Sequence, residues 1–316
     1  MTAEAPVKLT HNEAIKAAVP TLAGTIAATL THPEEDHFSP DDYEFLKFHG
    51  CYQQDDRDLR KAGKKYILMV RSRVPGGVMT ANQWKVFDQL ASAYGNNTLR
   101  ATTRQTIQFH GILKCNLRAV IKGINDSLLS TLAACGDVNR NVLAPPTPAY
   151  TPAREQVYAH CQAVAVALAP KTQAYHTIWI DGQQLDLAAD ENKNFVDPLY
   201  GPTYLPRKFK VAFAIPPVND LDVFANDVGL IAIIENDQLI GYNLAVGGGM
   251  GRTHWQRRDL SAARGRAGLY FGRPGGGGDQ SGADPPPRFR RPHRPQTCAP
   301  QICRRRKGRG LGAGRN

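Results

Sequence analysis

The stretch KYILMVRSRVPGGVMTANQWKVFDQLASAY, residues 65–94, decides the fold. Its first ten residues are rich in aliphatic side chains and lead into Pro-Gly-Gly at 75–77, which predicts a strand followed by a turn. In the second part Trp84, Phe87 and Leu90 recur at helical spacing, and Thr80 precedes them as an N-cap. The stretch therefore predicts a strand, a turn and an amphipathic helix.

The same alternation continues on the carboxyl side. Residues 99–113 favour a strand and residues 118–134 a second helix, so 66–135 predict a ferredoxin-like half-domain of the α+β class. The preceding residues, 1–65, are expected to form an amino-terminal arm, with a short helix near 12–18 and a polar surface loop at 53–58.

A second, mixed α/β domain is expected over residues 136–252. A helix is predicted at 154–168, where apolar residues return on one face. Four strands are predicted after it, at 177–180, 209–215, 230–234 and 239–245. The whole fold is therefore expected to be α+β.

The composition changes abruptly after Arg252. Residues 253–316 hold 14 Arg and 1 Lys against 3 Asp, which gives this segment a net charge of +12. The whole chain carries +11, so the first 252 residues are close to neutral. The tail is also rich in Gly and Pro and has no hydrophobic periodicity, which predicts disorder. Because its residue types share GC-rich codons, we expect it to be the product of a shifted reading frame.

The totals exclude several classes of protein. No apolar run approaches the roughly 20 residues that span a bilayer, and no signal peptide is evident, so a cytoplasmic protein without membrane contact is expected. The six cysteines form no C-x-x-C pair, which favours free buried thiols and predicts no metal site. The basic tail could bind phosphate backbones non-specifically, but it lacks regular Arg-Gly-Gly repeats, so no specific nucleic acid is expected.

Basic residues two apart on predicted strands are the main functional signal. Lys208 and Lys210 would point to one face of their strand, as would Arg71 and Arg73. The same two-residue spacing predicts a shared face for two further sets: Arg100, Thr102 and Arg104; and Gln108 with His110. Each set alone is compatible with a solvated sheet face. Together they predict a basic wall around a strongly anionic ligand.

Six motifs make this hypothesis specific: KFHGCYQQDDRDLR (47–60), VRSRVPGG (70–77), TRQTIQFHGI (103–112), DVNRNVL (137–143), TYLPRKFK (203–210) and NLAVGGGMG (243–251). In these motifs the chain resembles the haemoprotein subunit of assimilatory sulfite reductases. The resemblance is collinear from about residue 21 to 252 and covers about the first half of a member of that family.

The resemblance implies a cofactor, a substrate and their ligands. In the family a sirohaem is bridged through a cysteine sulfur to a 4Fe-4S cluster, and sulfite is reduced to sulfide with six electrons. Sulfite would be bound by Arg71, Arg140, Lys208 and Lys210. The sirohaem would be held by Arg100, Thr102, Arg104, Gln108, His110, Asn139, Arg207, Gly247, Gly248 and Gly249.

The resemblance also implies what this chain lacks. The family places its cluster cysteines in the second half, so a 316-residue chain is expected to be truncated and inactive. The electron donor would be an NADPH-dependent flavoprotein subunit or ferredoxin. A sirohaem nitrite reductase, which shares the architecture, and a nucleic-acid-binding protein acting through the tail are the alternative hypotheses.

Overall fold

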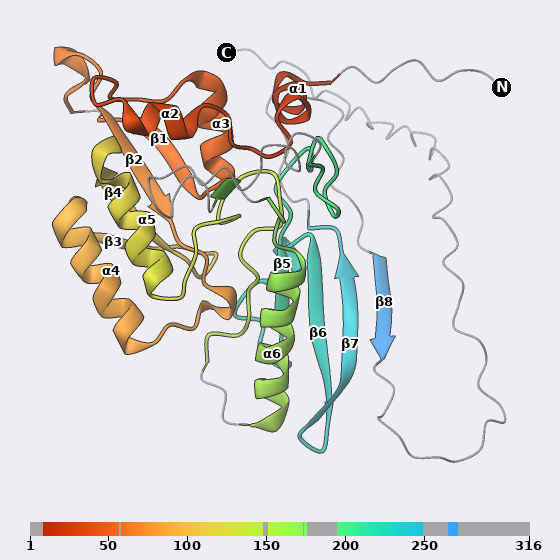
Figure 1. The fold of residues 1–316 in the computed structure, drawn as a ribbon. Helices are drawn as coiled ribbons and strands as arrows, with labels where there is room; N and C mark the ends of the chain where they lie inside the picture. The colour runs from red at the N-terminus through yellow and green to blue at the C-terminus, as the bar shows by residue number, and fades with distance from the viewer. Residues whose placement is uncertain are drawn as a thin grey trace, which may run out of the picture. The chain divides into compact units, whose positions relative to one another are not determined.

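The computed structural model describes residues 9–56, 58–147, 151–172, 174–175 and 195–248, together with the backbone of 265–270. Two sheets organise these residues, the first flanked by several helices and the second by one long helix (Figure 1). The first sheet is built from residues 51–112 and the second from residues 211–270. No helix in the described ranges is long and apolar enough to cross a membrane.

The first sheet is fully antiparallel and has the strand order β1-β2-β4-β3. Its strands are β1 (Cys51–Asp55), β2 (Tyr66–Arg71), β3 (Leu99–Ala101) and β4 (Ile107–Ile112). The helices α4 (Ala81–Tyr94) and α5 (Leu117–Asp126) belong to the same half. The predicted strand at 65–74 and helix at 81–94 are confirmed, and Thr80 forms a capping box with Gln83.

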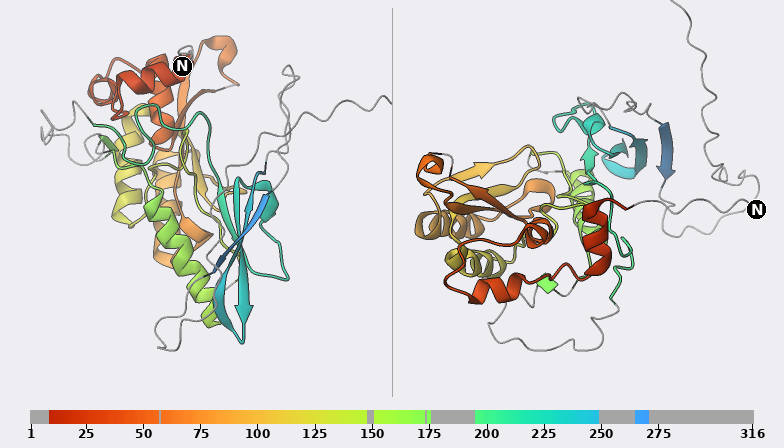
Figure 2. Two further views of the ribbon diagram at one scale, coloured as in Figure 1. Left: turned by 90° about the vertical axis from the view of Figure 1, so that its right-hand side faces the viewer. Right: turned by 90° about the horizontal axis from the view of Figure 1, so that it is seen from above.

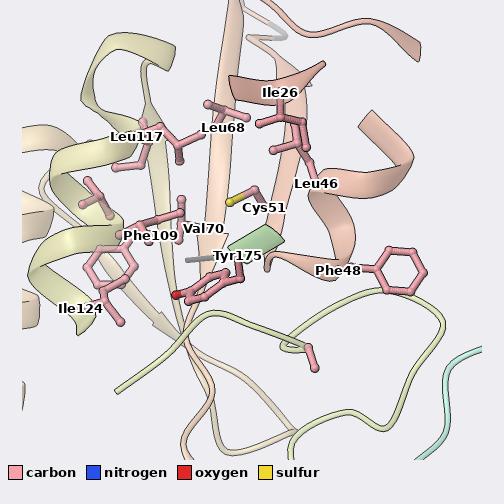
Figure 3. Packing of buried hydrophobic residues seen from close by; sticks show 14 of the residues in the cluster. Ile26, Leu46, Phe48, Cys51, Leu68, Val70, Phe109, Leu117, Ile124 and Tyr175 are labelled. Carbon is pink, nitrogen blue, oxygen red and sulfur yellow. The ribbon is translucent and has the colours of Figure 1, made fainter. Parts of the chain in front are cut away.

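The pairing register gives this sheet two unlike faces. Val70 pairs with both Cys51 and Phe109, and all three side chains are buried in the core. Figure 3 shows Val70 and Phe109 facing Leu117 and Ile124 of α5. Because neighbouring residues of a strand point to opposite faces, the next positions along each strand lie on the other side. That second face is mostly polar.

Residues 11–48 are part of the fold rather than an arm. The helices α1 (His11–Ala18), α2 (Ile26–Thr31) and α3 (Pro40–Phe48) precede β1, and Ile26, Phe45 and Leu46 are buried in the same core as the sheet. The predicted surface loop at 53–58 is wrong at its beginning, because residues up to Asp55 pair with β2. Only Cys51 of this strand is buried, so the polar residues at 53–55 show no apolar alternation that would predict a strand.

Two further predictions in this half need correction. The single strand expected at 99–113 is two strands, β3 and β4, joined by a turn at 102–106. The helix expected at 118–134 ends at Asp126, where Ser127 caps it and Leu128 adopts a positive φ of 63°. A left-handed residue cannot continue a right-handed helix.

The second sheet has the strand order β5-β6-β7-β8. Its strands are β5 (Val211–Ala214), β6 (Val228–Glu235), β7 (Gln238–Val246) and β8 (Gly265–Tyr270), of which only the pair β5–β6 is parallel. The helix α6 (Pro152–Ala167) packs along this sheet and shares a core with it (Figure 2). The predicted helix at 154–168 and the strands at 209–215, 230–234 and 239–245 are therefore confirmed.

Strand β8 corrects the expectation that residues 253–316 lack structure, because residues 265–270 pair antiparallel with β7. An exposed strand edge offers unpaired N–H and C=O groups to any nearby extended backbone, whatever its side chains. The rest of that tail, with Cys298 and Cys303, lies outside the described residues, as does the strand predicted at 177–180.

The segment 138–144 runs alongside the beginning of the second sheet. It forms parallel bridges from Asn139 to Phe209 and from Leu143 to Ala212. Backbone hydrogen bonds join Arg140 N to Phe209 O at 2.8 Å and Phe213 N to Leu143 O at 2.8 Å. We call this pairing the 138–144 junction. It joins the end of the ferredoxin-like half directly to the second sheet.

The buried His49 gives the first testable prediction. It is fully buried, its Nε2 lies 3.0 Å from the carbonyl oxygen of Leu22, and burial lowers its pKa from 6.5 to about 4. Between pH 6.5 and 4, His49 therefore binds a proton in the unfolded chain but not in the folded chain. We expect this histidine to lower the free energy of unfolding by roughly 3 kcal/mol as the pH falls through that window.

Urea denaturation at pH 7.5, 5.5 and 4.5 measures the effect, and His49→Gln is the control because it keeps a polar donor and does not titrate. The stability of the wild type should fall more steeply with acid than that of the variant. Equal slopes would contradict the assignment of a neutral, buried imidazole.

Candidate anion-binding site

The polar face of the first sheet presents Arg71 at the end of β2. Its backbone N–H donates to Gly50 O at 2.9 Å, and its Cα partner on β4 is Gln108. Arg100 on β3 pairs with the same glutamine from the other side. Three neighbouring strands therefore align Arg71, Gln108 and Arg100 in one row. Directly paired residues on adjacent strands point to the same face of the sheet, so the three side chains share that face.

Arg140 reaches the same region from the 138–144 junction. Its guanidinium is held by backbone carbonyls, with Nε donating to Gly136 O at 2.7 Å and Nη1 to Ala134 O at 3.4 Å. The turn before it is braced by Lys16 of α1, whose buried ammonium contacts Asp137 Oδ2 at 3.3 Å. Arg140 is thus fixed without an acidic partner in these contacts, so its positive charge is not neutralised by them.

Lys208 and Lys210 precede β5 and flank Phe209, the residue that pairs with Asn139. The backbone N–H of Lys210 donates to Asp227 Oδ2 at 2.7 Å, and its ammonium lies 3.4 Å from Ala225 O. Burial lowers the pKa of Lys208, and neighbouring cations lower it further. These cations are Arg140, Lys210, Arg207 and Arg71. The structure therefore brings Arg71, Arg140 and Lys210 within electrostatic reach of Lys208, and we call these four residues the cation cluster.

Tyr52 and Cys135 border the cation cluster, and sequence reasoning missed both. The Cys135 thiol is buried, and this burial raises its pKa, while Arg71, Arg140 and a hydrogen bond with Tyr52 oppose the rise. Burial likewise raises the pKa of Tyr52. Tyr52 falls in the segment expected to be an amino-terminal arm, and its pairing with Met69 in β1 places it on the same face of the sheet as Arg71. The only available signal for Cys135 was its place just before the motif at 137–143.

The expected pair of Arg71 and Arg73 is not formed. Arg73 follows the end of β2, is buried, and donates from Nη2 to Ala165 O of α6 at 2.8 Å. This burial lowers the pKa of its guanidinium to about 10. Strand alternation cannot be extrapolated beyond the last paired residue, and here the chain turns into the Pro-Gly-Gly segment.

The set of Arg100, Thr102 and Arg104 also separates, because β3 ends at Ala101. Thr102 closes the following turn with a 2.6 Å contact to the Thr106 hydroxyl. Arg104 crosses to the second sheet, where it donates to Asn226 Oδ1 and lies 3.4 Å from Val211 O. Its burial lowers its pKa to about 10. Arg104 thus joins the two sheets through its own hydrogen bonds.

Asn139 is the most unusual polar residue of the region. It is 1% exposed, and neither its Oδ1 nor its Nδ2 has a hydrogen-bond partner within the described part of the chain. Its backbone N–H is satisfied by the Tyr200 hydroxyl at 3.1 Å. A buried amide without partners costs about 1–3 kcal/mol, so a native protein retains one chiefly where another polar group completes it.

The remaining predicted residues have ordinary positions. Arg207 is exposed on the segment before the lysines. Gly248 has a φ of 83°, and a Cβ there would meet Asn226 O at 2.2 Å, so packing within the chain already requires glycine. Gly247 donates its N–H to Asp227 O at 3.0 Å, and Gly249 lies outside the described residues.

The donor set of this region fits one of the two groups that the resemblance implies. The cation cluster and the unsatisfied donor Asn139 Nδ2 fit an anionic ligand rich in carboxylate oxygens, whereas Asn139 Oδ1 would need a hydrogen-bond donor. For a metal or an iron–sulfur cluster, the described ranges hold no group of three or more His, Cys, Asp or Glu that could act as ligands. Cys51, Cys135 and Cys161 are free and buried, whereas Cys115 is exposed, contrary to the expectation of buried thiols.

Family models match two segments of the chain. Residues 60–127 match the nitrite/sulfite reductase ferredoxin-like half domain. Residues 162–263 match the nitrite and sulphite reductase 4Fe-4S domain, and this match continues beyond Arg252. The chain belongs to the nitrite and sulfite reductase family. The α+β fold with a ferredoxin-like half-domain is thereby confirmed.

Curated relatives agree with this assignment. The chain is 49% identical over 253 residues to the sulfite reductase (NADPH) hemoprotein beta-component of Staphylococcus saprophyticus, which covers 78% of this chain and 44% of the relative. It is 51% identical over 239 residues to the component of the same name from Shouchella clausii, covering 74% of the chain and 41% of the relative. The chain therefore spans less than half the length of these relatives.

A solved structure shows the same fold. The NirA protein of Mycobacterium tuberculosis superposes with a TM-score of 0.57 at 21% identity, over 77% of this chain and 42% of that chain. This likeness concerns the fold alone.

The contacts of Arg104 generate a prediction about stability. A lysine at this position retains the charge but cannot present several donors in a fixed plane to Asn226 and the two carbonyls. We expect Arg104→Lys to lower the free energy of unfolding by about 1–3 kcal/mol, since buried acceptors are left unpaired. Arg100→Lys, at an exposed position on the neighbouring strand, should change it by less than about 0.5 kcal/mol. Comparable losses in both variants, measured by urea denaturation, would disprove the role of Arg104 as a link between the sheets.

Proposed function

We propose that this chain forms the sulfite-binding part of a sirohaem-dependent sulfite reductase and uses the cation cluster to bind the substrate. The observation that carries the proposal is the convergence of four basic side chains from three separate segments, without carboxylate partners in their described contacts. Like charges repel, so their convergence costs free energy that a bound anion offsets. The names of the curated relatives support sulfite as that anion.

The charge of the ligand favours sulfite over nitrite. Sulfite is a dianion at alkaline pH and offers three oxygens, whereas nitrite carries a single charge on two oxygens. Four cations complement the first ion more completely than the second. Two guanidinium groups supply paired donors at fixed angles, and two ammonium groups supply compact charge. Nitrite remains the competing substrate, and its relative affinity is the comparison to measure.

Sirohaem, when bound, would supply electrons to the sulfur of the substrate. Its rim carboxylates fit the exposed Arg100 and Arg207, and the unsatisfied amide of Asn139 would gain a polar partner from a group bound beside the junction. Arg104 is less suited to this role, since its donors already serve Asn226 and two carbonyls. The described residues do not supply ligands for a 4Fe-4S cluster, and we assign no step to one.

The chain's own residues would contribute binding and proton supply. Reduction of sulfite to sulfide takes six electrons and releases three oxygens as water, so protons must reach the S–O oxygens. Cations around the anion would withdraw electron density from these oxygens and weaken the bonds. The lowered pKa of Lys208 makes its ammonium a better proton donor than an ordinary lysine. Arg71 and Arg140 would hold charge without releasing protons.

The rest of the enzyme would come from outside this segment. The chain spans 44% of one relative, and we propose that the residues corresponding to the other part supply the cluster ligands and complete the pocket. The relatives are named as the hemoprotein beta-components of NADPH sulfite reductases, which supports a separate flavoprotein subunit as the electron donor. We place the protein in the cytoplasm, where reducing conditions keep thiols unpaired, such as the four free cysteines among the described residues.

Anion titration tests the proposal on the chain itself. Isothermal calorimetry at pH 8 and low salt should show sulfite binding more tightly than nitrite. Lys208→Met should weaken sulfite binding about tenfold, since a charge-assisted hydrogen bond is lost. Lys85→Met, at an exposed position on α4, is the matched control for the loss of one positive charge. An equal loss in both variants, or tighter binding of nitrite, would contradict the proposal.

A further inference from the structure

The side-chain amide of Gln108 lies between Arg71 and His110 on the polar face of the first sheet. With its oxygen turned toward β2, it accepts from Arg71 Nε at 3.0 Å and also from Arg71 Nη2. Its nitrogen then donates to His110 Nε2 across 3.2 Å. Gln108 itself is buried, so water does not replace these contacts easily. The amide therefore connects one member of the cation cluster to a titratable ring.

Turning the amide by half a rotation would reverse this hydrogen-bond balance. When it is turned by half a rotation, Oε1 lies 3.2 Å from His110 Nε2. The amide N–H groups then face the Arg71 guanidinium, donor against donor. The first orientation requires an unprotonated Nε2, which only the neutral imidazole provides. The second suits a protonated ring, because His⁺ donates from both nitrogens.

The surroundings of His110 come from three strands. Its own strand, β4, contributes Gln108; β3 contributes Arg100; and β2 contributes Arg71. In the described part of the chain these two arginines are the charged groups that act on the ring. Burial lowers the pKa of His110, and the charges of Arg100 and Arg71 lower it further. The neutral ring, and with it the first orientation, is therefore the state at neutral and alkaline pH.

We propose that Gln108 is a positioning residue for Arg71, and that protonation of His110 turns the Gln108 amide and releases the Arg71 guanidinium. The neutral ring accepts from the amide nitrogen and so directs the amide oxygen to Arg71. The protonated ring donates a hydrogen bond to the amide oxygen, which then no longer accepts from Arg71. A role of this switch in sulfite binding rests on the proposed function. The coupling between Arg71, Gln108 and His110 does not depend on the proposed function.

The coupling is measurable by NMR on the full 316-residue chain without sulfite or sirohaem. The pKa of His110 is followed through its ring ¹⁵N shifts in wild type, Arg71→Met, Gln108→Met and the double variant. Removing Arg71 deletes a positive charge in both backgrounds. Only where Gln108 is present does it also free the amide oxygen for His110. We therefore expect Arg71→Met to raise the pKa of His110 by about 0.5 more in the Gln108 background than in Gln108→Met.

Arg100→Met is the matched control, since Arg100 acts on His110 through its charge and is not joined to it by the amide. Its effect on the pKa should be the same with and without Gln108. The ¹⁵N shifts should also show Nε2 unprotonated in the neutral ring. Equal effects of Arg71→Met in both backgrounds, or a neutral ring protonated at Nε2, would overturn the proposal.

A second variant serves if the buried methionine prevents folding. Gln108→Leu likewise removes both polar atoms of the amide, with a branched side chain in place of the linear one, so nothing can rotate between Arg71 and His110. The additional effect of Arg71→Met should vanish in this background as well. Its persistence there would show that the amide is not the link. Loss of sulfite binding with the coupling intact would count against the proposed function and leave this inference standing.

Discussion

The 138–144 junction is the pairing on which the rest of the site depends. The bonds from Arg140 N to Phe209 O and from Phe209 N to Val138 O join a segment that leaves the ferredoxin-like half to the segment that enters the second sheet. Backbone pairing fixes position to a fraction of an ångström, which flexible side chains cannot do. Arg140 is brought beside Lys208 and Lys210 for this reason, although 68 residues of chain separate Arg140 from Lys208.

The face of the first sheet that points away from its hydrophobic core is the face that carries Arg71 toward the junction. Val70 and Phe109 must point into the core, so Arg71 and Gln108 must point away from it. A shift of one residue in the pairing would bury the arginine and expose the valine. The free energy of core packing therefore also holds the functional row in place. Arg104 completes the arrangement by reaching Asn226 across the two sheets.

Much of this could be predicted from the sequence, and the failures have physical causes. Regular periodicity predicted α4, α6 and the strands β2, β6 and β7. The sequence motifs also predicted the members of the cation cluster, although their roles stay predictions. The prediction that residues two apart share one face of a strand failed for Arg73 and Arg104, because both lie beyond a strand end, where the chain turns. Tyr52 was missed because β1 is half-exposed, and β8 because pairing with an edge needs no apolar pattern.

The central claim is that backbone pairing at the junction assembles the cation cluster. Hydrogen–deuterium exchange of the Arg140 amide tests it most directly, since that amide donates to Phe209 O at 2.8 Å. The account predicts protection comparable to that of core amides such as Val70 in β2, with opening only through unfolding of the junction. Exchange at the rate of an exposed loop would contradict it.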